Sequence, residues 1–322
     1  MEDNTHPTAD HHFTSTMTLA QMGVSSVPEC YILPPAERPT LEQTPPSTVS
    51  ALPVIDLSSL ENPVLQPHVI EQVHTACKEF GGFQVINHGI PVSLTDQALD
   101  VAADFFDMPN DTKMQFASTN VHEPVRKKMG NYAKALLLLH TKLIQIVFES
   151  LGQQSDYLQN DVEQGSQVIA VNCYPTCPEP NLALGLPRHS DYGLLTIILQ
   201  DQQGLEVMDR NENWQPVPLI EGALVVQVGD QMEVLSNGRY KSIVHRATVN
   251  LEKKRLSIAS LHSLAINRKV TPAPDLVDER HPLSYKEGSF EDFLNFLSDN
   301  DILEGRYIDT LRKNSDSISE AK

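Results

Sequence analysis

The chain has 322 residues, of which 40% are hydrophobic and 20% are charged, and it carries a formal net charge of −18 with a pI near 5.0. This length allows one large domain with a sizeable core, or two small ones. A surface this negative repels nucleic acids and anionic membranes, so we expect neither as a partner. The four cysteines show neither a disulfide framework nor paired zinc spacings, and the N-terminus lacks the apolar segment of a signal peptide. We therefore expect a cytoplasmic protein.

The N-terminal part of the chain changes character after about fifty residues. Residues 1–50 are rich in Thr, Ser, Pro and His without a sustained period, which predicts a disordered or extended arm. Residues 51–166 are expected to form a helical and mixed region. Within it, the apolar runs 52–57 and 83–87 predict two strands.

Three helices are predicted in the same region. The first runs from Pro67 to Phe80 and is stopped by Gly81, and the second runs from Leu94 to Phe106. The third is the clearest, because six apolar residues share one face over about five turns. They are Tyr132, Leu136, Leu139, Leu143, Val147 and Leu151.

The remainder of the chain divides into a β-rich part and a helical end. Residues 167–265 contain short apolar runs separated by Gly, Pro and Asn, which is typical of a sandwich or barrel. Residues 266–322 are expected to be helical. Ser289, with Asp292 three positions later, predicts a capping box at the start of one helix.

One group of residues indicates a metal centre. His189 and Asp191 are two positions apart, so in an extended segment both side chains point to one face. His245 lies in another strand-like run and is the best candidate for a third ligand. Two imidazoles and one carboxylate on one face of an octahedral ion leave the opposite face open, as in non-haem Fe(II) oxygenases. We expect the neighbouring Arg246 to be a surface or interdomain charge.

A second group indicates a site for an acidic small molecule. Arg255 and Ser257 are also two positions apart in an apolar strand pattern, so both face the same way. A buried guanidinium requires an anion and binds a carboxylate bidentately, and a serine hydroxyl can donate a further hydrogen bond. A dicarboxylic cosubstrate would satisfy this pair.

Together with the segments 53–56, 82–83, 87–90 and 172–175, these motifs make the chain resemble the plant 2-oxoglutarate/Fe(II)-dependent dioxygenases, in particular the flavanone 3-hydroxylase and salicylate hydroxylase groups. The resemblance implies a mainly β fold, a double-stranded β-helix or jelly roll with flanking helices. It implies His189, Asp191 and His245 as metal ligands, with no catalytic residue beyond the metal site. The implied cosubstrate-binding residues are Arg255, Ser257, Asn172 and Tyr174.

The same resemblance implies the chemistry. Fe(II) is the metal, 2-oxoglutarate and O2 are consumed, ascorbate supports the reaction, and succinate and CO2 are released. The substrate is expected to be a small plant metabolite, a flavonoid or another aromatic compound of secondary metabolism, which is hydroxylated or desaturated. We expect a monomer that meets only small molecules.

The chain departs from the family pattern at one place, and three alternatives stay open. A stretch of several tens of residues that most relatives carry between Arg126 and Lys127 is absent, which suggests a shortened form with an exposed sheet edge. Such a form could be a catalytically impaired isoform that only binds metal and a small molecule. A zinc hydrolase built on the same triad is a second alternative. Aminocyclopropane carboxylate oxidase, which uses ascorbate in place of 2-oxoglutarate, is a third.

Overall fold

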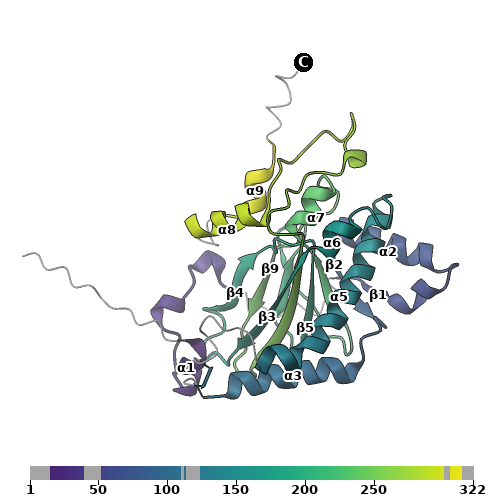
Figure 1. Ribbon diagram of the computed structural model, residues 1–322. Coiled ribbons are helices and arrows are strands. Elements are labelled where there is room, and N and C mark those ends of the chain that lie inside the picture. The colour runs from purple at the N-terminus through teal and green to yellow at the C-terminus, as the bar shows by residue number, and fades with distance from the viewer. Residues whose placement is uncertain (1–14, 40–51, 110–111, 114–123, 301–304, 314–322) are drawn as a thin grey trace, which may run out of the picture.

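The computed structural model describes residues 15–39, 52–109, 112–113, 124–300 and 305–313. Figure 1 shows a β-sheet core with helices α2, α3 and α5 on one side and the C-terminal helices α8 and α9 at one end. Among the described residues, no helix is both long enough and apolar enough to cross a membrane.

The larger of two sheets contains six strands. In chain order they are β1 (Val54–Asp56), β2 (Gly82–Ile86), β3 (Ser166–Tyr174), β5 (Leu195–Gln200), β8 (Leu224–Val228) and β10 (Arg255–Ser263). Their order across the sheet is β1-β2-β8-β5-β10-β3. All neighbours are antiparallel except β1 and β2. The strand β5 and the strand β8 are buried along their whole length because other layers cover both of their faces.

The smaller sheet faces the larger one and contains four strands. They are β4 (Leu184–His189), β6 (Leu205–Met208), β7 (Trp214–Pro216) and β9 (His245–Thr248). Their order is β4-β9-β6-β7, and all neighbours are antiparallel. Two sheets whose strands alternate along the chain in this way form the expected jelly-roll core with flanking helices.

Three long helices pack against the larger sheet and against one another. They are α2 (Gln66–Glu79), α3 (Val92–Asp107) and α5 (Pro124–Ser150). The six apolar residues predicted to share one face of the third helix are all buried, so this prediction is confirmed. The predicted stop of the first helix is also confirmed, because Gly81 adopts a φ of 71° that side chains disfavour.

The expected N-terminal arm is only partly extended. Residues 15–39 contain α1 (Thr16–Gln21) and two 3-10 helices, η1 (Glu29–Tyr31) and η2 (Pro35–Glu37), whereas residues 1–14 and 40–50 lie outside the described part. The arm is attached to the loop between β3 and β4. The Leu33 amide donates to the Leu182 carbonyl at 2.9 Å, and the Val27 amide donates to Glu179 Oε2 at 2.9 Å.

Short helices complete the described structure. They are η3 (Leu57–Glu61), α6 (Gln159–Glu163), α7 (Asp230–Leu235), η4 (Pro274–Leu276), α8 (Phe290–Asp299) and α9 (Tyr307–Leu311). The capping box predicted at the start of α8 is confirmed, because the Asp292 amide donates to Ser289 Oγ and the Ser289 amide donates to Asp292 Oδ2.

Strand β3 forms one edge of the larger sheet. Among the described residues it pairs with β10 alone, over its full length of nine residues. Its outer side therefore carries backbone groups without a strand partner, and Val168 on this strand is 48% exposed.

Candidate metal centre and cosubstrate pocket

The jelly roll brings His189, Asp191 and His245 together. His189 is the last residue of β4 and pairs with His245, the first residue of β9, while Asp191 follows two positions later in the turn. The three side chains each offer a ligand atom, and these atoms lie within 4.8 Å of one another. Asp191 Oδ1 is 3.6 Å from His189 Nε2 and 3.9 Å from His245 Nε2.

Local contacts present both imidazoles to the same point. Nδ1 of His189 lies 2.8 Å from the Pro187 carbonyl, and Nδ1 of His245 lies 3.2 Å from the Ile243 carbonyl. Each Nδ1 therefore carries the hydrogen, and each Nε2 lone pair faces the centre. Burial, reinforced by His189, lowers the pKa of His245 to about 4, which keeps this ring neutral at physiological pH. Two imidazole nitrogens and a carboxylate fit Fe(II) with open positions.

Strand pairing assembles the four residues expected to hold the cosubstrate. Arg255 of β10 lies opposite Tyr174 of β3, and Ser257 lies opposite Asn172. Residues directly opposite each other, and residues two apart on one strand, share a face of the sheet, so all four side chains emerge on the same side. The Arg255 guanidinium carbon lies 5.1 Å from the centre of the Tyr174 ring.

Arg255 is a buried cation that lacks a carboxylate partner. Its side chain is only 3% exposed, and it donates to the Gln202 carbonyl at 3.1 Å and to Gln200 Oε1 at 3.0 Å. Burial lowers its pKa, although nearby Tyr174 and Asp201 oppose that shift. No ion pair to Arg255 occurs within the described ranges. A buried guanidinium whose direct hydrogen-bond acceptors in the described ranges, the Gln202 carbonyl and Gln200 Oε1, are neutral is a candidate site for an anion.

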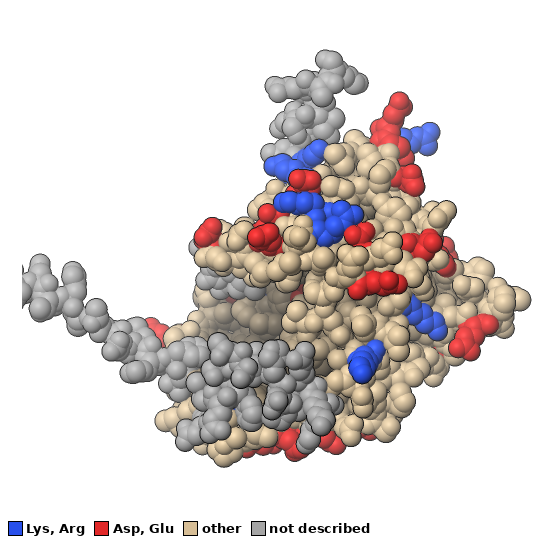
Figure 2. Space-filling view, viewed as in Figure 1, with Lys and Arg blue, Asp and Glu red and all other residues tan. Residues whose placement is uncertain are grey.

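A pocket of about 200 Å³, here called the metal pocket, opens beside the metal ligands. Besides His189 and Asp191, its lining is mostly apolar and aromatic and comes from the strands and from the C-terminal helices. Figure 2 shows a hollow beneath these helices whose visible wall is uncharged. The aromatic members are Tyr192, Phe290, Phe293, Phe296 and Tyr307.

The sequence did not reveal this aromatic wall. The rings of Tyr192 and Phe293 are stacked with centroids 4.7 Å apart, although the two residues lie a hundred positions apart in the chain. The contact joins segments distant in sequence, so no local pattern indicated it. Asp230 was missed as well: this buried carboxyl lines the pocket, and burial raises its pKa to about 7.

The expectation for Arg246 was wrong. Its side chain is 4% exposed, and its Nε donates to Glu206 Oε2 at 2.7 Å. Its guanidinium also lies 4.1 Å from the centre of the Trp214 ring. Pairing of β9 with β6 places Arg246 opposite Glu206, and the charge is therefore compensated inside the smaller sheet.

Comparison with known families agrees with this geometry. Residues 165–263 match the model of the 2OG-Fe(II) oxygenase superfamily. Residues 52–139 match a second model, described as the N-terminal domain of non-haem dioxygenases in morphine synthesis.

Sequence alignments with known plant proteins extend over most of the chain. Flavanone 3-dioxygenase 3 of Oryza sativa subsp. japonica is 38% identical over 87% of this chain and 98% of the relative. That alignment runs over 322 positions, more than the matched part of this chain contains, so a stretch of the relative has no counterpart here. Protein DOWNY MILDEW RESISTANCE 6 of Arabidopsis thaliana is 34% identical over 84% and 90% of the two chains.

Solved structures show the same fold. A crystal structure of JOX2 in complex with 2OG, Fe and JA superposes with a TM-score of 0.78 at 28% identity, covering 88% of this chain and 93% of that one. A rice dioxygenase for auxin oxidation superposes with a TM-score of 0.71 at 24% identity, covering 81% and 100%. The chain therefore belongs to the 2-oxoglutarate/Fe(II)-dependent dioxygenases, and its cofactors are Fe(II) and 2-oxoglutarate.

Proposed function

We propose that this dioxygenase oxidises a C–H bond of a small aromatic plant metabolite, with release of succinate and CO2. In this proposal His189, Asp191 and His245 hold the iron. Iron with bound 2-oxoglutarate and O2 supplies the oxidising chemistry, and the protein supplies position and shielding.

The observation that carries the proposal is the buried, unpaired charge of Arg255. A dicarboxylate that reaches the metal with one end would place its other carboxylate on the guanidinium and on Ser257 Oγ. Asn172 and Tyr174, on the facing strand, would close the other side. A cosubstrate that is bound at both ends has a single orientation, so its binding energy also holds it in the geometry that the reaction requires.

The metal pocket supports an aromatic substrate. It is the pocket that contains metal-ligand side chains, so a molecule within it can present a C–H bond to the iron. Stacked aromatic walls bind flat rings through offset and edge contacts. The name of the rice relative, flavanone 3-dioxygenase 3, points in the same direction, whereas JOX2 was crystallised with JA.

The test is substrate-dependent formation of succinate. Iron-loaded full-length chain is incubated with 2-oxoglutarate, ascorbate and single members of a flavanone, flavone and phenolic acid panel. One class should raise succinate release several-fold above the uncoupled rate, and mass spectrometry should show a product heavier by one oxygen or lighter by two hydrogens. Arg255→Gln should abolish the rise, whereas the exposed Arg280→Gln should not. Succinate release that no panel member stimulates would contradict the aromatic substrate.

A second candidate function is binding without turnover. Within the described part of the chain, strand β3 has a strand partner on one side alone, and part of the rice relative has no counterpart here. A shortened isoform of this kind would bind iron and 2-oxoglutarate yet release no succinate with any substrate. The same assay separates the two functions, because only the enzyme forms product.

A further inference from the structure

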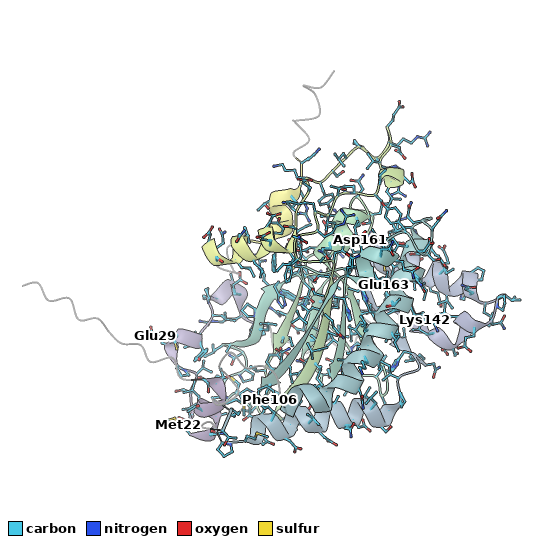
Figure 3. All side chains as sticks on the ribbon, viewed as in Figure 1. Met22, Glu29, Phe106, Lys142, Asp161 and Glu163 are labelled. Atoms are coloured by element: carbon cyan, nitrogen blue, oxygen red, sulfur yellow. The ribbon has the colours of Figure 1, made fainter. Side chains whose placement is uncertain are left out.

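The described structure contains a second cavity, which is lined by none of the three proposed metal ligands. It has a volume of about 530 Å³ and lies between the N-terminal arm, the ends of β3 and β4 nearest their connecting loop, and the loop before β10. We call it the arm pocket. Figure 3 shows Met22 and Glu29 of the arm on the same side of the barrel as Phe106, the residue of α3 that lines the arm pocket.

The arm pocket is separate from the metal pocket. None of its described lining residues is a metal ligand, and the two pockets share no lining residue in the described ranges. Strand β4 runs from Leu184 at the arm pocket to His189 at the metal. Leu186, the lining residue of this strand nearest to His189, is three residues of extended chain from it, roughly 10 Å. The arm pocket therefore ends short of the metal ligands along this strand.

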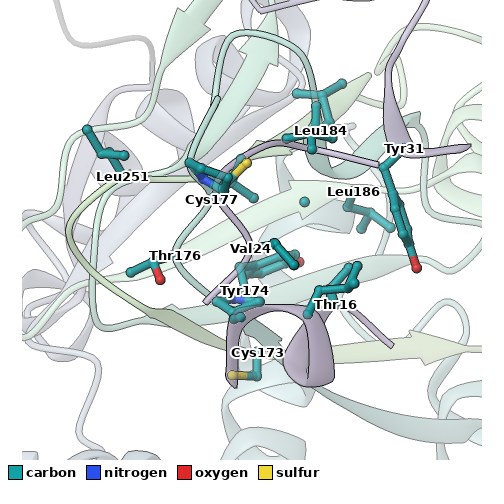
Figure 4. A pocket seen from close by; sticks show the side chains of 18 of the residues that line it. Thr16, Val24, Tyr31, Cys173, Tyr174, Thr176, Cys177, Leu184, Leu186 and Leu251 are labelled. Atoms are coloured by element: carbon teal, nitrogen blue, oxygen red, sulfur yellow. The ribbon is translucent and has the colours of Figure 1, made fainter. Parts of the chain in front are cut away.

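The lining of the arm pocket is uncharged. The chain carries a net charge of −18, yet none of the described residues around this cavity is Asp, Glu, Lys, Arg or His. Figure 4 shows Val24 and Tyr31 of the arm, Tyr174 of β3, and Leu184 and Leu186 of β4 around a common space. Such walls discriminate against ions, because a charge placed there would lose its hydration without gaining a partner.

Size and chemistry together define the occupant. A cavity of this volume falls within the range of small-molecule sites, which are mostly apolar with a few polar groups. The polar side chains here are hydroxyl, amide and thiol groups, such as those of Tyr31, Thr176 and Cys177. From these features we infer that the arm pocket is a second binding site, specific for a neutral, largely apolar small molecule with aromatic rings.

A ligand bound in the arm pocket would contact both the N-terminal arm and residues of the proposed cosubstrate site. Helix α1 contains no buried residue, so a ligand beneath it would add apolar contacts that the arm now lacks. Tyr174 lines the arm pocket and also lies against Arg255. Asn172 lines the arm pocket as well, so a bound molecule would contact two residues of the proposed 2-oxoglutarate site.

The test uses Nile red, a neutral aromatic dye, with full-length protein in the presence of a chelator, so that the result does not depend on iron or on turnover. Wild type should bind the dye saturably at one site per chain. Val24→Glu on the arm and Leu251→Glu on the opposite wall should each weaken binding at least about tenfold. Leu297→Glu in the metal pocket and Val64→Glu on an exposed turn should bind as wild type.

Two further measurements use wild-type protein alone, so they test the arm pocket even if a variant is unstable. The anionic dye 8-anilinonaphthalene-1-sulfonate should bind wild type at least about tenfold more weakly than Nile red. Hydrogen exchange in residues 16–33 should slow when Nile red is bound. Non-saturable dye binding, loss of binding in Leu297→Glu but not in Val24→Glu and Leu251→Glu, or an unchanged arm would each overturn the inference.

Discussion

At Gly185 the absence of a side chain makes room for Tyr174, a residue of the proposed cosubstrate site. A Cβ at this position would lie 2.4 Å from Cδ1 of the Tyr174 ring, which is closer than real Cβ contacts allow. Tyr174 in turn lies against Arg255. The glycine thus allows strand β4 to approach the Tyr174 ring closely.

We expect Gly185→Ala to displace the Tyr174 ring and to weaken 2-oxoglutarate binding by about tenfold, which corresponds to about 1.4 kcal/mol. Isothermal titration of the metal-loaded protein measures this affinity. Gly130→Ala is the matched control, because a Cβ there meets nothing within 4 Å. This helical change should leave affinity unchanged and raise stability slightly. Equal affinity in both variants would show that the Tyr174 ring does not matter for binding.

Two buried histidines should make stability depend on pH. His140 and His262 are stacked with ring centroids 4.0 Å apart, and neither nitrogen of His140 has a hydrogen-bond partner. Burial lowers the pKa of His262 to about 4, and burial with the neighbouring His262 lowers that of His140 well below 6.5. Both rings therefore stay neutral in the folded chain, while the unfolded chain binds protons below pH 6.5.

The free energy of unfolding should be unaffected by these rings above pH 6.5 and should fall as the pH drops towards 4. The slope is at most about 1.4 kcal/mol per pH unit for each ring. His140→Phe keeps the stacked geometry and removes two unpaired nitrogens. Urea denaturation at about pH 7.5 and pH 5 should show a smaller loss for this variant than for wild type. An identical loss in both proteins would assign the acid sensitivity to other groups.

At the scale of elements, Glu233 links helix α7 to the C-terminal segment. Its carboxylate is fully buried and accepts hydrogen bonds from Tyr285 Oη at 2.7 Å, Arg312 at 3.0 Å and Lys241 at 3.2 Å. It also accepts from the Ser242 amide at 2.7 Å. Burial works to raise the pKa of Glu233, but Lys241 and the other donors hold it below its ordinary value. Because α8 and α9 wall the metal pocket, this carboxylate helps to position that wall.

We expect Glu233→Gln to lower the free energy of unfolding by about 2 kcal/mol, since buried donors lose a charged acceptor. Hydrogen exchange in α9 should rise at the same time. Asp309→Asn serves as the control, because it removes a half-exposed partner of Arg312 and should cost less than about 1 kcal/mol. If both substitutions had the same small effect, the buried carboxylate would not anchor the C-terminal segment.

Local patterns predicted the elements, but they did not predict long-range contacts. The apolar face of α5 and the capping box of α8 depend on residues three or four positions apart, and both predictions are confirmed. The placement of Arg255 opposite Tyr174 depends on strand register across some eighty residues, which only the fold reveals. Arg246 was misjudged for the same reason, since its partner Glu206 lies on another strand. The aromatic wall of the metal pocket likewise joins distant segments.

For the molecule as a whole, the edge of the larger sheet at β3 matters most, because among the described residues no strand pairs with its outer side. Loss of the stretch between Arg126 and Lys127 would create such an edge. Edge strands with unpaired backbone groups pair with other chains unless a charge or a bulge prevents it. We expect the protein to self-associate at high concentration through this edge. Val168→Lys on β3 should slow the growth of light scattering several-fold. Val64→Lys, on a more exposed turn residue, should not. Equal scattering in both variants would rule out the edge as the contact.

We expect this chain to bind iron and 2-oxoglutarate through the residues described above. The measurement is anaerobic titration of the apo-protein with Fe(II) and 2-oxoglutarate, because a metal-chelated keto acid produces a weak visible charge-transfer band. We predict a band that saturates at one equivalent of each ligand and that is lost in Arg255→Ala. A folded, iron-loaded wild-type chain that shows no band, or a band of equal affinity in Arg255→Ala, would contradict it.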